Sequence, residues 1–319
     1  MSETPGLHHR PVMVEEVVDL LRPVPAGVVV DATVGLGGHA RAVLAALGHV
    51  RLVGLDQDTD ALAAAAGALA EFGDRVVLRQ ARFDRLNAVL EQLGERGGVA
   101  AVLFDLGVSS PQLDRPERGF SYRADGPLDM RMDRTSAGGR TAADVVNTYD
   151  EPALARVLRT YGDERYAGRI ARAVVAARPV TGTAQLAEVV RGAIPAPARR
   201  RGGDPARRTF QALRIEVNEE LDVLRPALEQ AVDALAPGGR LVVLAYHSGE
   251  DRIVKEVLRD AETGGCVCPP GLPCVCGARP RVRLLKRGAR KPSAEEVARN
   301  HRAESARLRA AEKLPEDAA

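Results

Sequence analysis

Short apolar runs alternate with amphipathic segments in the first third of the chain. The runs predict strands at residues 28–30, 52–55, 76–78 and 99–106. The amphipathic segments predict one helix before the first strand, at 13–21, and helices between the strands that end at 47, after a glycine turn, and that span 60–69 and 86–93. Strands that alternate with helices at this interval indicate a doubly wound, parallel α/β sheet. The fourth run is almost continuously apolar, which is typical of a strand buried on both faces.

The alternation stops after the fourth predicted strand, and residues 114–204 contain no convincing strand. The remaining predicted elements are helices at 151–160, 164–177, 184–192 and 207–224, a turn at 235–240, a strong strand at 241–246 and weaker strands at 282–285 and 306–311. The simplest architecture is an α/β domain formed by residues 1–113 and 205–319. A helical insertion of ordinary domain size, residues 114–204, interrupts it.

The composition is that of a soluble globular protein, with 45% hydrophobic and 28% charged residues in a chain of 319. No apolar stretch approaches the roughly 20 residues that a membrane-spanning helix needs. Residues 1–10 also lack the apolar core of a signal peptide. We therefore expect a cytoplasmic protein with no membrane partner, and the sequence leaves its oligomeric state open.

The net charge of +2 implies no polyanionic partner by itself, but two basic clusters stand out. The first contains Arg199, Arg200, Arg201, Arg207 and Arg208, and the second contains Arg279, Arg281, Arg283, Lys286, Arg287, Arg290 and Lys291. Such clusters on an otherwise balanced chain suit nucleic acid binding. The alternative is a set of solvated loops in an arginine-rich protein.

All four cysteines fall close together, as Cys266-Val-Cys268 and Cys274-Val-Cys276. Four thiolates on either side of a proline-rich turn can bind a zinc ion, although Cys-x-x-Cys is the more common spacing. The alternative is a loop of reduced thiols. The sequence alone therefore assigns no metal.

A glycine-rich turn follows the first predicted strand, within the segment from Asp31 to His39. Its glycines at positions 35, 37 and 38 let the backbone approach a ligand, and the next helix offers unpaired N–H groups at its N-terminus. Asp56, at the end of the second strand, can accept hydrogen bonds from both hydroxyls of a ribose. The pattern Gly-x-Gly-x-x-Ala predicts a nucleotide cofactor, but it does not distinguish NAD from S-adenosylmethionine.

Further candidates follow the third and fourth strands. Phe83 can flank an adenine ring or fill the core. Asp105 ends the fourth strand and Ser109 follows in the next loop, so both are expected near the glycine turn at the carboxyl ends of the strands. A carboxylate there can accept hydrogen bonds from an exocyclic amine and assist proton loss. The alternative for Asp105 is a turn-forming or helix-capping residue.

Two later segments can contact a nucleic acid. Phe120 and Tyr122 can stack on a base, or their segment is a hinge that packs on the insertion. The arginines expected on phosphates are Arg118, Arg123 and Arg131. His247 and Ser248 can contact the substrate base, although capping of the next helix is the expected role for residues 248–251.

Eight segments occur in an order that is shared with a known family. They are His9-to-Val12, Asp31-to-His39, Leu103-to-Asp114, Gly126-to-Asp133, Arg208-to-Ala212, Leu235-to-Arg240, His247-to-Arg252 and Pro292-to-Leu308. Together they resemble the bacterial family of ribosomal small-subunit RNA (cytosine-N4)-methyltransferases, over nearly the whole chain. The segments that begin at Asp105 and Gly126 are far more specific than the glycine turn.

The resemblance implies an S-adenosylmethionine-dependent enzyme that methylates N4 of one cytidine in the decoding region of 16S rRNA, in the small ribosomal subunit. It also implies the class I methyltransferase fold, with the helical insertion as the domain for the RNA substrate. The implied cofactor contacts are Gly37, Gly38, His39, Asp56, Phe83, Asp105 and Gln112. The chain departs from the family's pattern at Tyr246, where phenylalanine is usual, and at Gly249, where leucine is usual.

For such a reaction we expect Asp105, with backbone carbonyls near Ser109, to accept hydrogen bonds from the N4 amine of an exposed or flipped cytosine. The cofactor supplies the activation, so the protein mainly places the amine. Two other functions fit parts of the sequence. One is an NAD-linked oxidoreductase, although a Tyr-x-x-x-Lys pair for hydride transfer is missing, and the other is a non-catalytic RNA-binding assembly factor.

Overall fold

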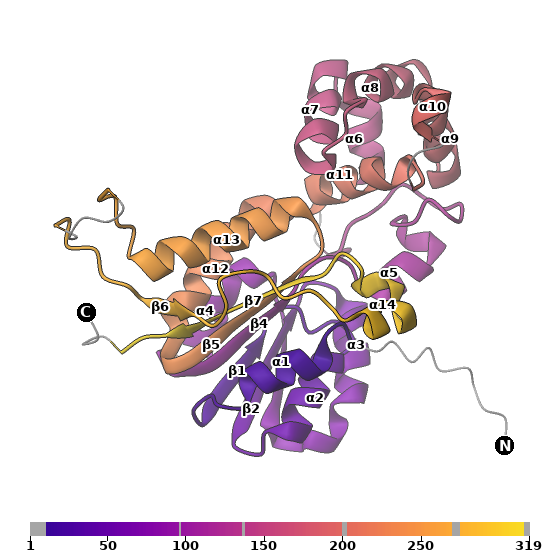
Figure 1. The fold of residues 1–319 in the computed structure, drawn as a ribbon. Coiled ribbons are helices and arrows are strands. Elements are labelled where there is room, and N and C mark those ends of the chain that lie inside the picture. Colours follow the sequence, from indigo (N-terminus) through magenta and orange to yellow (C-terminus); the bar gives the residue numbers. More distant parts are fainter. Residues whose placement is uncertain (1–10, 96, 136–137, 200–202, 270–274, 316–319) are drawn as a thin grey trace, which may run out of the picture. The chain divides into compact units, whose positions relative to one another are not determined.

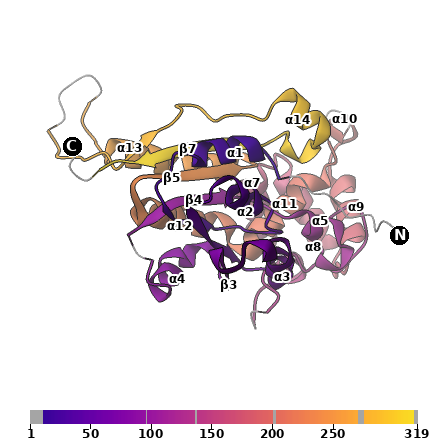
Figure 2. The same cartoon turned by 90° about the horizontal axis from the view of Figure 1, so that it is seen from below.

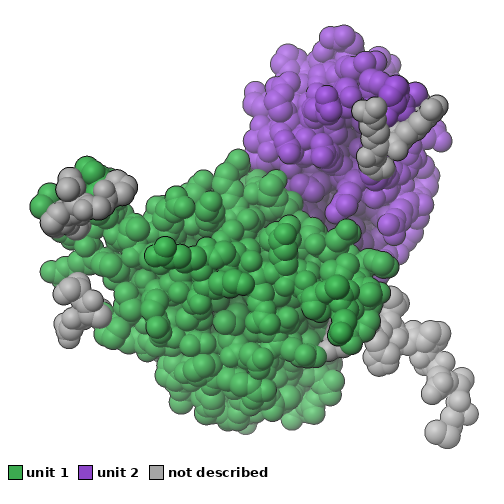
Figure 3. Space-filling model, in the orientation of Figure 1, with its two compact units in different colours: residues 1–107, 221–319 green, residues 108–220 purple. Residues whose placement is uncertain are grey.

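The computed structural model describes residues 11–95, 97–135, 138–199, 203–269 and 275–315. The chain divides into two compact units, one formed by Met1–Gly107 with Leu221–Ala319 and one formed by Val108–Glu220 (Figure 3). The sequence features at His9, Arg200, Arg201 and Cys274 lie outside the described residues. Within those residues, no helix is both long and apolar enough to cross a membrane.

The first unit is built on a seven-stranded sheet with the strand order β3-β2-β1-β4-β5-β7-β6 (Figure 1). The strands are β1 (Gly27–Asp31), β2 (Val50–Asp56), β3 (Val76–Gln80), β4 (Val99–Asp105), β5 (Leu235–Ala245), β6 (Val282–Leu284) and β7 (Arg307–Lys313). The first five are parallel, and β7 runs antiparallel to β5 and β6. The strand order reverses between β1 and β4, the point at which doubly wound sheets bind ligands. The predicted Rossmann-like sheet is confirmed.

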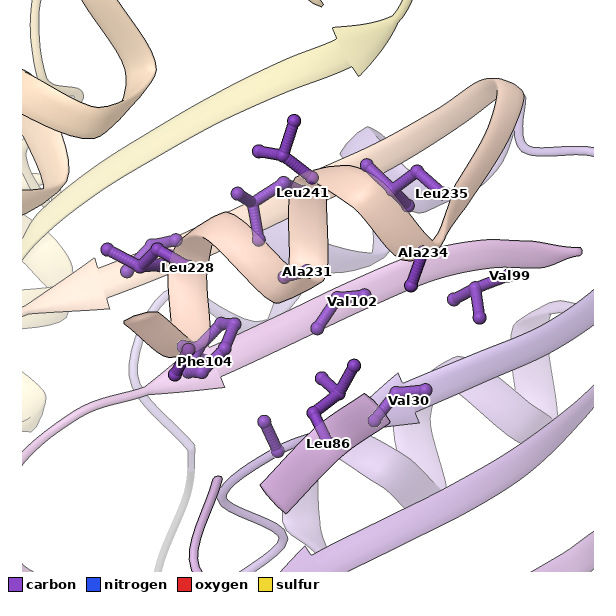
Figure 4. Packing of buried hydrophobic residues seen from close by; sticks show 14 of the residues in the cluster. Val30, Leu86, Val99, Val102, Phe104, Leu228, Ala231, Ala234, Leu235 and Leu241 are labelled. Carbon is purple, nitrogen blue, oxygen red and sulfur yellow. The ribbon is translucent and has the colours of Figure 1, made fainter. Parts of the chain in front are cut away.

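Helices cover both faces of this sheet (Figure 2). One face carries α1 (Val14–Leu21), α2 (Gly38–Ala46) and α3 (Thr59–Ala68), and the other carries α4 (Leu86–Gln92), α12 (Glu220–Ala234) and α13 (Ser248–Thr263). A further helix, α14 (Ala294–Arg299), precedes β7. On β4, Phe104 faces Leu228 of α12 (Figure 4). Leu103 belongs to the core on the opposite face of the sheet. Burial of both faces explains why the central strands β1 and β4 are almost wholly apolar.

The second unit is helical and has a core of its own. Its helices are α5 (Ser110–Asp114), α6 (Ala142–Thr148), α7 (Glu151–Gly162), α8 (Ala167–Ala176), α9 (Thr183–Ala193), α10 (Ala196–Arg199) and α11 (Ala206–Asn218). Leu158, Leu186 and Phe210 lie in one buried cluster that joins these helices. The described part of this unit contains no strand, only an isolated bridge between Pro127 and Gly182.

Three expectations differ from the structure. The helix predicted at 207–224 is two helices, because Glu219 adopts a left-handed conformation (φ 53°) between α11 and α12. Residues 235–240 are not a separate turn, since they extend β5 with a shift of register against β4. The helical unit, 108–220, is wider than the predicted insertion, 114–204, because α11 contributes to the helical core.

Candidate active site

Three carboxylates lie at the carboxyl ends of neighbouring parallel strands. Asp31 ends β1, Asp56 ends β2 and Asp105 ends β4, and we call these residues the carboxylate edge. The order of the strands places them at the switch point of the sheet. They lie close enough to interact, since the charges of Asp56 and Asp105 both raise the pKa of Asp31.

The glycine turn between β1 and α2 runs beside this edge. Gly35 and Gly37 are left-handed, with φ values of 52° and 80°, and Gly37 is the N-cap of α2. A Cβ atom on Gly38 would lie 2.5 Å from Cγ of Pro11, and one on Gly37 would lie 3.3 Å from Cγ of Leu69. The glycines at 37 and 38 are therefore also required by packing within the first unit, a reason that the sequence pattern alone does not give.

Asp56 is held by the backbone of two turns. Its Oδ2 accepts the N–H of Gly35 (2.9 Å) and its Oδ1 accepts the N–H of Asp58 (2.9 Å). Burial raises its pKa to about 6, although these N–H groups lower it. The backbone of Gln57 is a third donor, and a carboxylate has about four lone-pair positions, so about one remains for another donor such as a hydroxyl of a ribose.

Asp105 has a defined neighbour on each oxygen. The hydroxyl of Tyr246 donates to Oδ1 (2.6 Å), and Nδ1 of His39 lies 3.4 Å from Oδ2. The backbone N–H of Asp105 donates to Oγ1 of Thr33 (2.7 Å). The side chain remains 26% exposed, so the oriented carboxylate can still be reached from outside the protein.

His39 is nearly enclosed, at 5% exposure, and both of its ring nitrogens are used within the first unit. Nε2 lies 2.9 Å from the carbonyl oxygen of Val12, opposite the contact of Nδ1 with Asp105. Burial lowers the pKa of His39, but the carboxylates of Asp105 and Asp31 outweigh it, and the net shift is upward. When protonated, the ring donates to both the carbonyl of Val12 and the carboxylate of Asp105. Because both nitrogens are then used, His39 acts on the site by orienting Asp105 and not by contacting a ligand itself.

Asp31 is 2% exposed, and its Oδ1 accepts the N–H of Thr33 (3.2 Å). Burial raises its pKa to about 7, against the lowering effects of the His39 charge and of this N–H. The side chain therefore changes charge near neutral pH.

The end of β5 supplies Tyr246 and the cap of α13. Glu250 is buried, and its Oε2 accepts the backbone N–H groups of Tyr246 (2.7 Å) and His247 (3.2 Å). Nδ1 of His247 accepts the N–H of Gly249 (3.2 Å). The predicted capping role of Glu250 is confirmed, and His247 shares it. Burial and the charge of Asp105 raise the pKa of Tyr246, so its hydroxyl stays protonated and acts as a donor.

Three further candidates, Phe83, Ser109 and Gln112, have contacts of their own. The ring of Phe83 meets Phe104 edge to face (centroids 5.8 Å apart) and packs on the sheet core, although it is only partly buried. Ser109 and Gln112 belong to the second unit, where Oε1 of Gln112 accepts the N–H of Ser109 (2.9 Å) at the start of α5. Gln112 is 5% exposed, so its side chain is used within that unit.

The stacking role predicted for Phe120 is wrong, because this ring is 5% exposed in the core of the second unit. Arg118, predicted on a phosphate, is 3% exposed and lies over that ring. Tyr122 packs against Phe210 with ring centroids 5.6 Å apart. Arg131 is paired with Asp129 (2.7 Å). The hinge-like alternative thus describes the segment better.

The basic clusters are mostly at the surface. Arg123, Arg207 and Arg208 are exposed on the second unit. In the second cluster, Arg281 is paired with an aspartate (2.6 Å) and Arg283 with a glutamate (2.8 Å). The exposed members of that cluster are Arg279, Arg281, Arg283, Lys286, Arg287, Arg290 and Lys291.

Sequence reasoning missed Asp31, Thr33 and Tyr246 as members of the site. Asp31 carried a signal, since it is a charged residue at the end of an apolar strand, as are the other two carboxylates. The contact between Tyr246 and Asp105 joins positions 141 residues apart and gave no local signal.

Comparisons with known proteins show similarity over almost the whole chain. Residues 6–314 match the model of the MraW methylase family. The chain is 59% identical to the ribosomal RNA small subunit methyltransferase H of Frankia alni over 314 residues, which is 96% of this chain and 95% of that protein. It is 52% identical to the protein of the same name from Heliobacterium modesticaldum over 312 residues, 96% of this chain and 99% of that one.

Proposed function

The chain belongs to the MraW methylase family, and from this premise we propose that it methylates ribosomal RNA of the small subunit. The proposed reaction transfers a methyl group from S-adenosylmethionine to the N4 amine of a cytidine in the decoding region of 16S rRNA. The sheet is that of a class I methyltransferase, with β7 antiparallel between β5 and β6. The carboxylate edge is the observation that carries the proposal.

The charge of this edge favours S-adenosylmethionine over NAD. S-adenosylmethionine carries a cationic sulfonium and supplies its methyl group, whereas NAD carries an anionic pyrophosphate. Asp31, Asp56 and Asp105 surround the glycine turn with carboxylates, which attract a cation and repel a pyrophosphate. The residues present therefore fit the methyl donor, with Asp56 on the ribose and Gly37, Gly38 and the partly buried Phe83 nearby.

In this proposal Asp105 is the residue that meets the substrate. Its carboxylate accepts hydrogen bonds from the exocyclic amine, holds the nitrogen lone pair toward the methyl donor and assists loss of the proton. Tyr246 and His39 fix the orientation of that carboxylate from opposite sides.

The helical unit is proposed as the part that recognises the RNA. Its exposed arginines include Arg123, Arg207 and Arg208, and arginine side chains bind phosphates bidentately. The substrate would be the small ribosomal subunit or its 16S rRNA, and the protein would act in the cytoplasm.

The test is methylation of small subunits from a strain that lacks this gene, with labelled S-adenosylmethionine and detection of N4-methylcytidine by mass spectrometry. Asp105→Ala should lower the rate by at least about 100-fold while binding of the RNA is retained. Asp74→Ala, a change of an exposed aspartate, is the control. Full activity of Asp105→Ala would remove this residue from the mechanism.

Two outcomes would favour other functions. No N4-methylcytidine from the wild-type protein would favour a non-catalytic assembly factor. Binding of NADH that is tighter than that of S-adenosylmethionine would favour an oxidoreductase.

A further inference from the structure

Three cysteine thiols meet in the loop that follows α13. The Sγ atoms of Cys266, Cys268 and Cys276 all lie within 4.8 Å of one another, and those of Cys266 and Cys276 are 3.7 Å apart. A disulfide requires about 2.05 Å, so this pair is not bonded. Two thiolates on one tetrahedral zinc ion, each about 2.3 Å from the metal, are about 3.8 Å apart. We propose that these three thiols form a zinc site.

The valines between the cysteines support this arrangement. Val267 is 86% exposed and Val275 is 88% exposed, and they are the large hydrophobic residues that the described structure leaves most open. The neighbouring thiols of Cys266 and Cys268 are less exposed than Val267. Cys276 is exposed, but Cys266 and Cys268 are half-buried while the valine between them is open, and because the hydrophobic effect alone would turn the valine inward, this orientation needs another source of free energy. Metal–thiolate bonds supply it.

The backbone of the loop also suits a thiolate. The N–H of Val275 donates to Sγ of Cys268 (3.4 Å), and hydrogen bonds to a charged acceptor are stronger than those to a neutral one. Gly277 directly follows Cys276 in a left-handed conformation (φ 72°), which turns the chain beside the sulfur.

Both ends of the loop are fastened to the end of α13. The N–H of Arg281 donates to the carbonyl of Ala261 (2.8 Å), and the N–H of Gly265 donates to that of Asp260 (2.9 Å). Gly264 is left-handed (φ 63°), and a Cβ atom there would lie 2.3 Å from the carbonyl oxygen of Arg279. The two arms of the loop therefore approach closely at its base, which brings together thiols that are ten positions apart.

The site is structural and separate from the carboxylate edge. The helix α13 begins at Ser248, two residues after Tyr246, and ends at Thr263, just before the cysteines. A helix of 16 residues is about 24 Å long. Soft thiolates in a tetrahedral set select zinc among the available divalent ions, and a reducing compartment prevents their oxidation to disulfides.

The test is the metal content of the full-length protein, purified under reducing conditions and dialysed against a weak chelator. We expect one zinc per chain by mass spectrometry of the metal, and cobalt substitution should give the charge-transfer absorption of tetrahedral thiolate coordination. Cys266→Ser and Cys276→Ser should each lose at least about 90% of the bound metal, while Val267→Ser, in the same loop, should keep it. Circular dichroism of each variant establishes that the rest of the chain is folded.

Absence of stoichiometric zinc and of the cobalt spectrum in the reduced wild-type protein would overturn the proposal. So would metal binding that survives Cys266→Ser and Cys276→Ser together.

Discussion

Replacement of Asp31 by asparagine tests the electrostatics of the carboxylate edge. The pKa of Asp31 is raised from 3.8 to about 7, mainly by burial, while the charge of His39 and the N–H of Thr33 oppose the shift. The unfolded carboxyl loses its proton at lower pH than the folded one, so the free energy of unfolding falls as the pH rises from 3.8 to about 7 and is level above it. A shift of about three pKa units corresponds to roughly 4 kcal/mol.

Asparagine has nearly the same shape and does not ionise, so Asp31→Asn should lack this loss. Urea unfolding of the protein without ligand gives the free energy of unfolding at pH 5 and at pH 8. Its decrease between these two pH values should be smaller in Asp31→Asn than in the wild type by roughly 3 kcal/mol, because about two of the three pH units between the unfolded and folded pKa values lie in this interval. Asp74→Asn, at an exposed position, should follow the wild type. An equal decrease in wild type and Asp31→Asn would refute the reasoning, because the buried carboxylate would then be ionised without cost.

Three other substitutions test other parts of the structure. Tyr246→Phe introduces the residue that is usual at this position in the family and removes the donor to Asp105, so it should lower kcat by no more than about tenfold with an unchanged Kd for S-adenosylmethionine, since a hydrogen bond contributes about 0.5–1.5 kcal/mol net; steady-state kinetics with calorimetry separate the two, and a loss of affinity alone would contradict this role. Asp56→Asn should raise the Kd for S-adenosylmethionine at least about tenfold by calorimetry, and an unchanged Kd would exclude the ribose contact. Gly119→Ala places a Cβ atom 2.2 Å from the carbonyl oxygen of Pro127. It should lower the melting temperature by several degrees more than Gly138→Ala, a position where φ is also positive but no atom lies within 4 Å of the added Cβ. Equal effects of the two substitutions would contradict the steric argument.

The sheet could be predicted because its signals are local. The apolar run at β4 and the charged residue that ends it lie next to each other in the sequence, and both faces of the strand are buried as that pattern indicates. The break at Glu219 could not be predicted, since residues on both sides of it have helical spacing and a left-handed glutamate has no sequence signature.

The site was predictable only in part, for the same reason. Asp56 and Asp105 stand at strand ends, and strand ends are visible in a sequence. The partners of Asp105, Tyr246 and His39, come from elements that meet only in the folded sheet. Phe120 and Arg118 show the opposite failure: an aromatic residue beside arginines has the composition of an RNA-binding surface, but here the pair is buried.

The position of β7 bears on how the chain folds during synthesis. β5 pairs with β4 on one side and with β7 on the other, and β7 begins only at Arg307. A ribosome that adds about 5–20 residues per second needs roughly 3–14 s to pass from the end of β5 to the end of β7. During that interval the edge of β5 that will pair with β7 has no native partner strand, and this edge includes Leu241 and Val243. Such an edge is open to pairing with other chains. The edge of β5 that later pairs with β7 is thus a part of the nascent protein that a chaperone would protect.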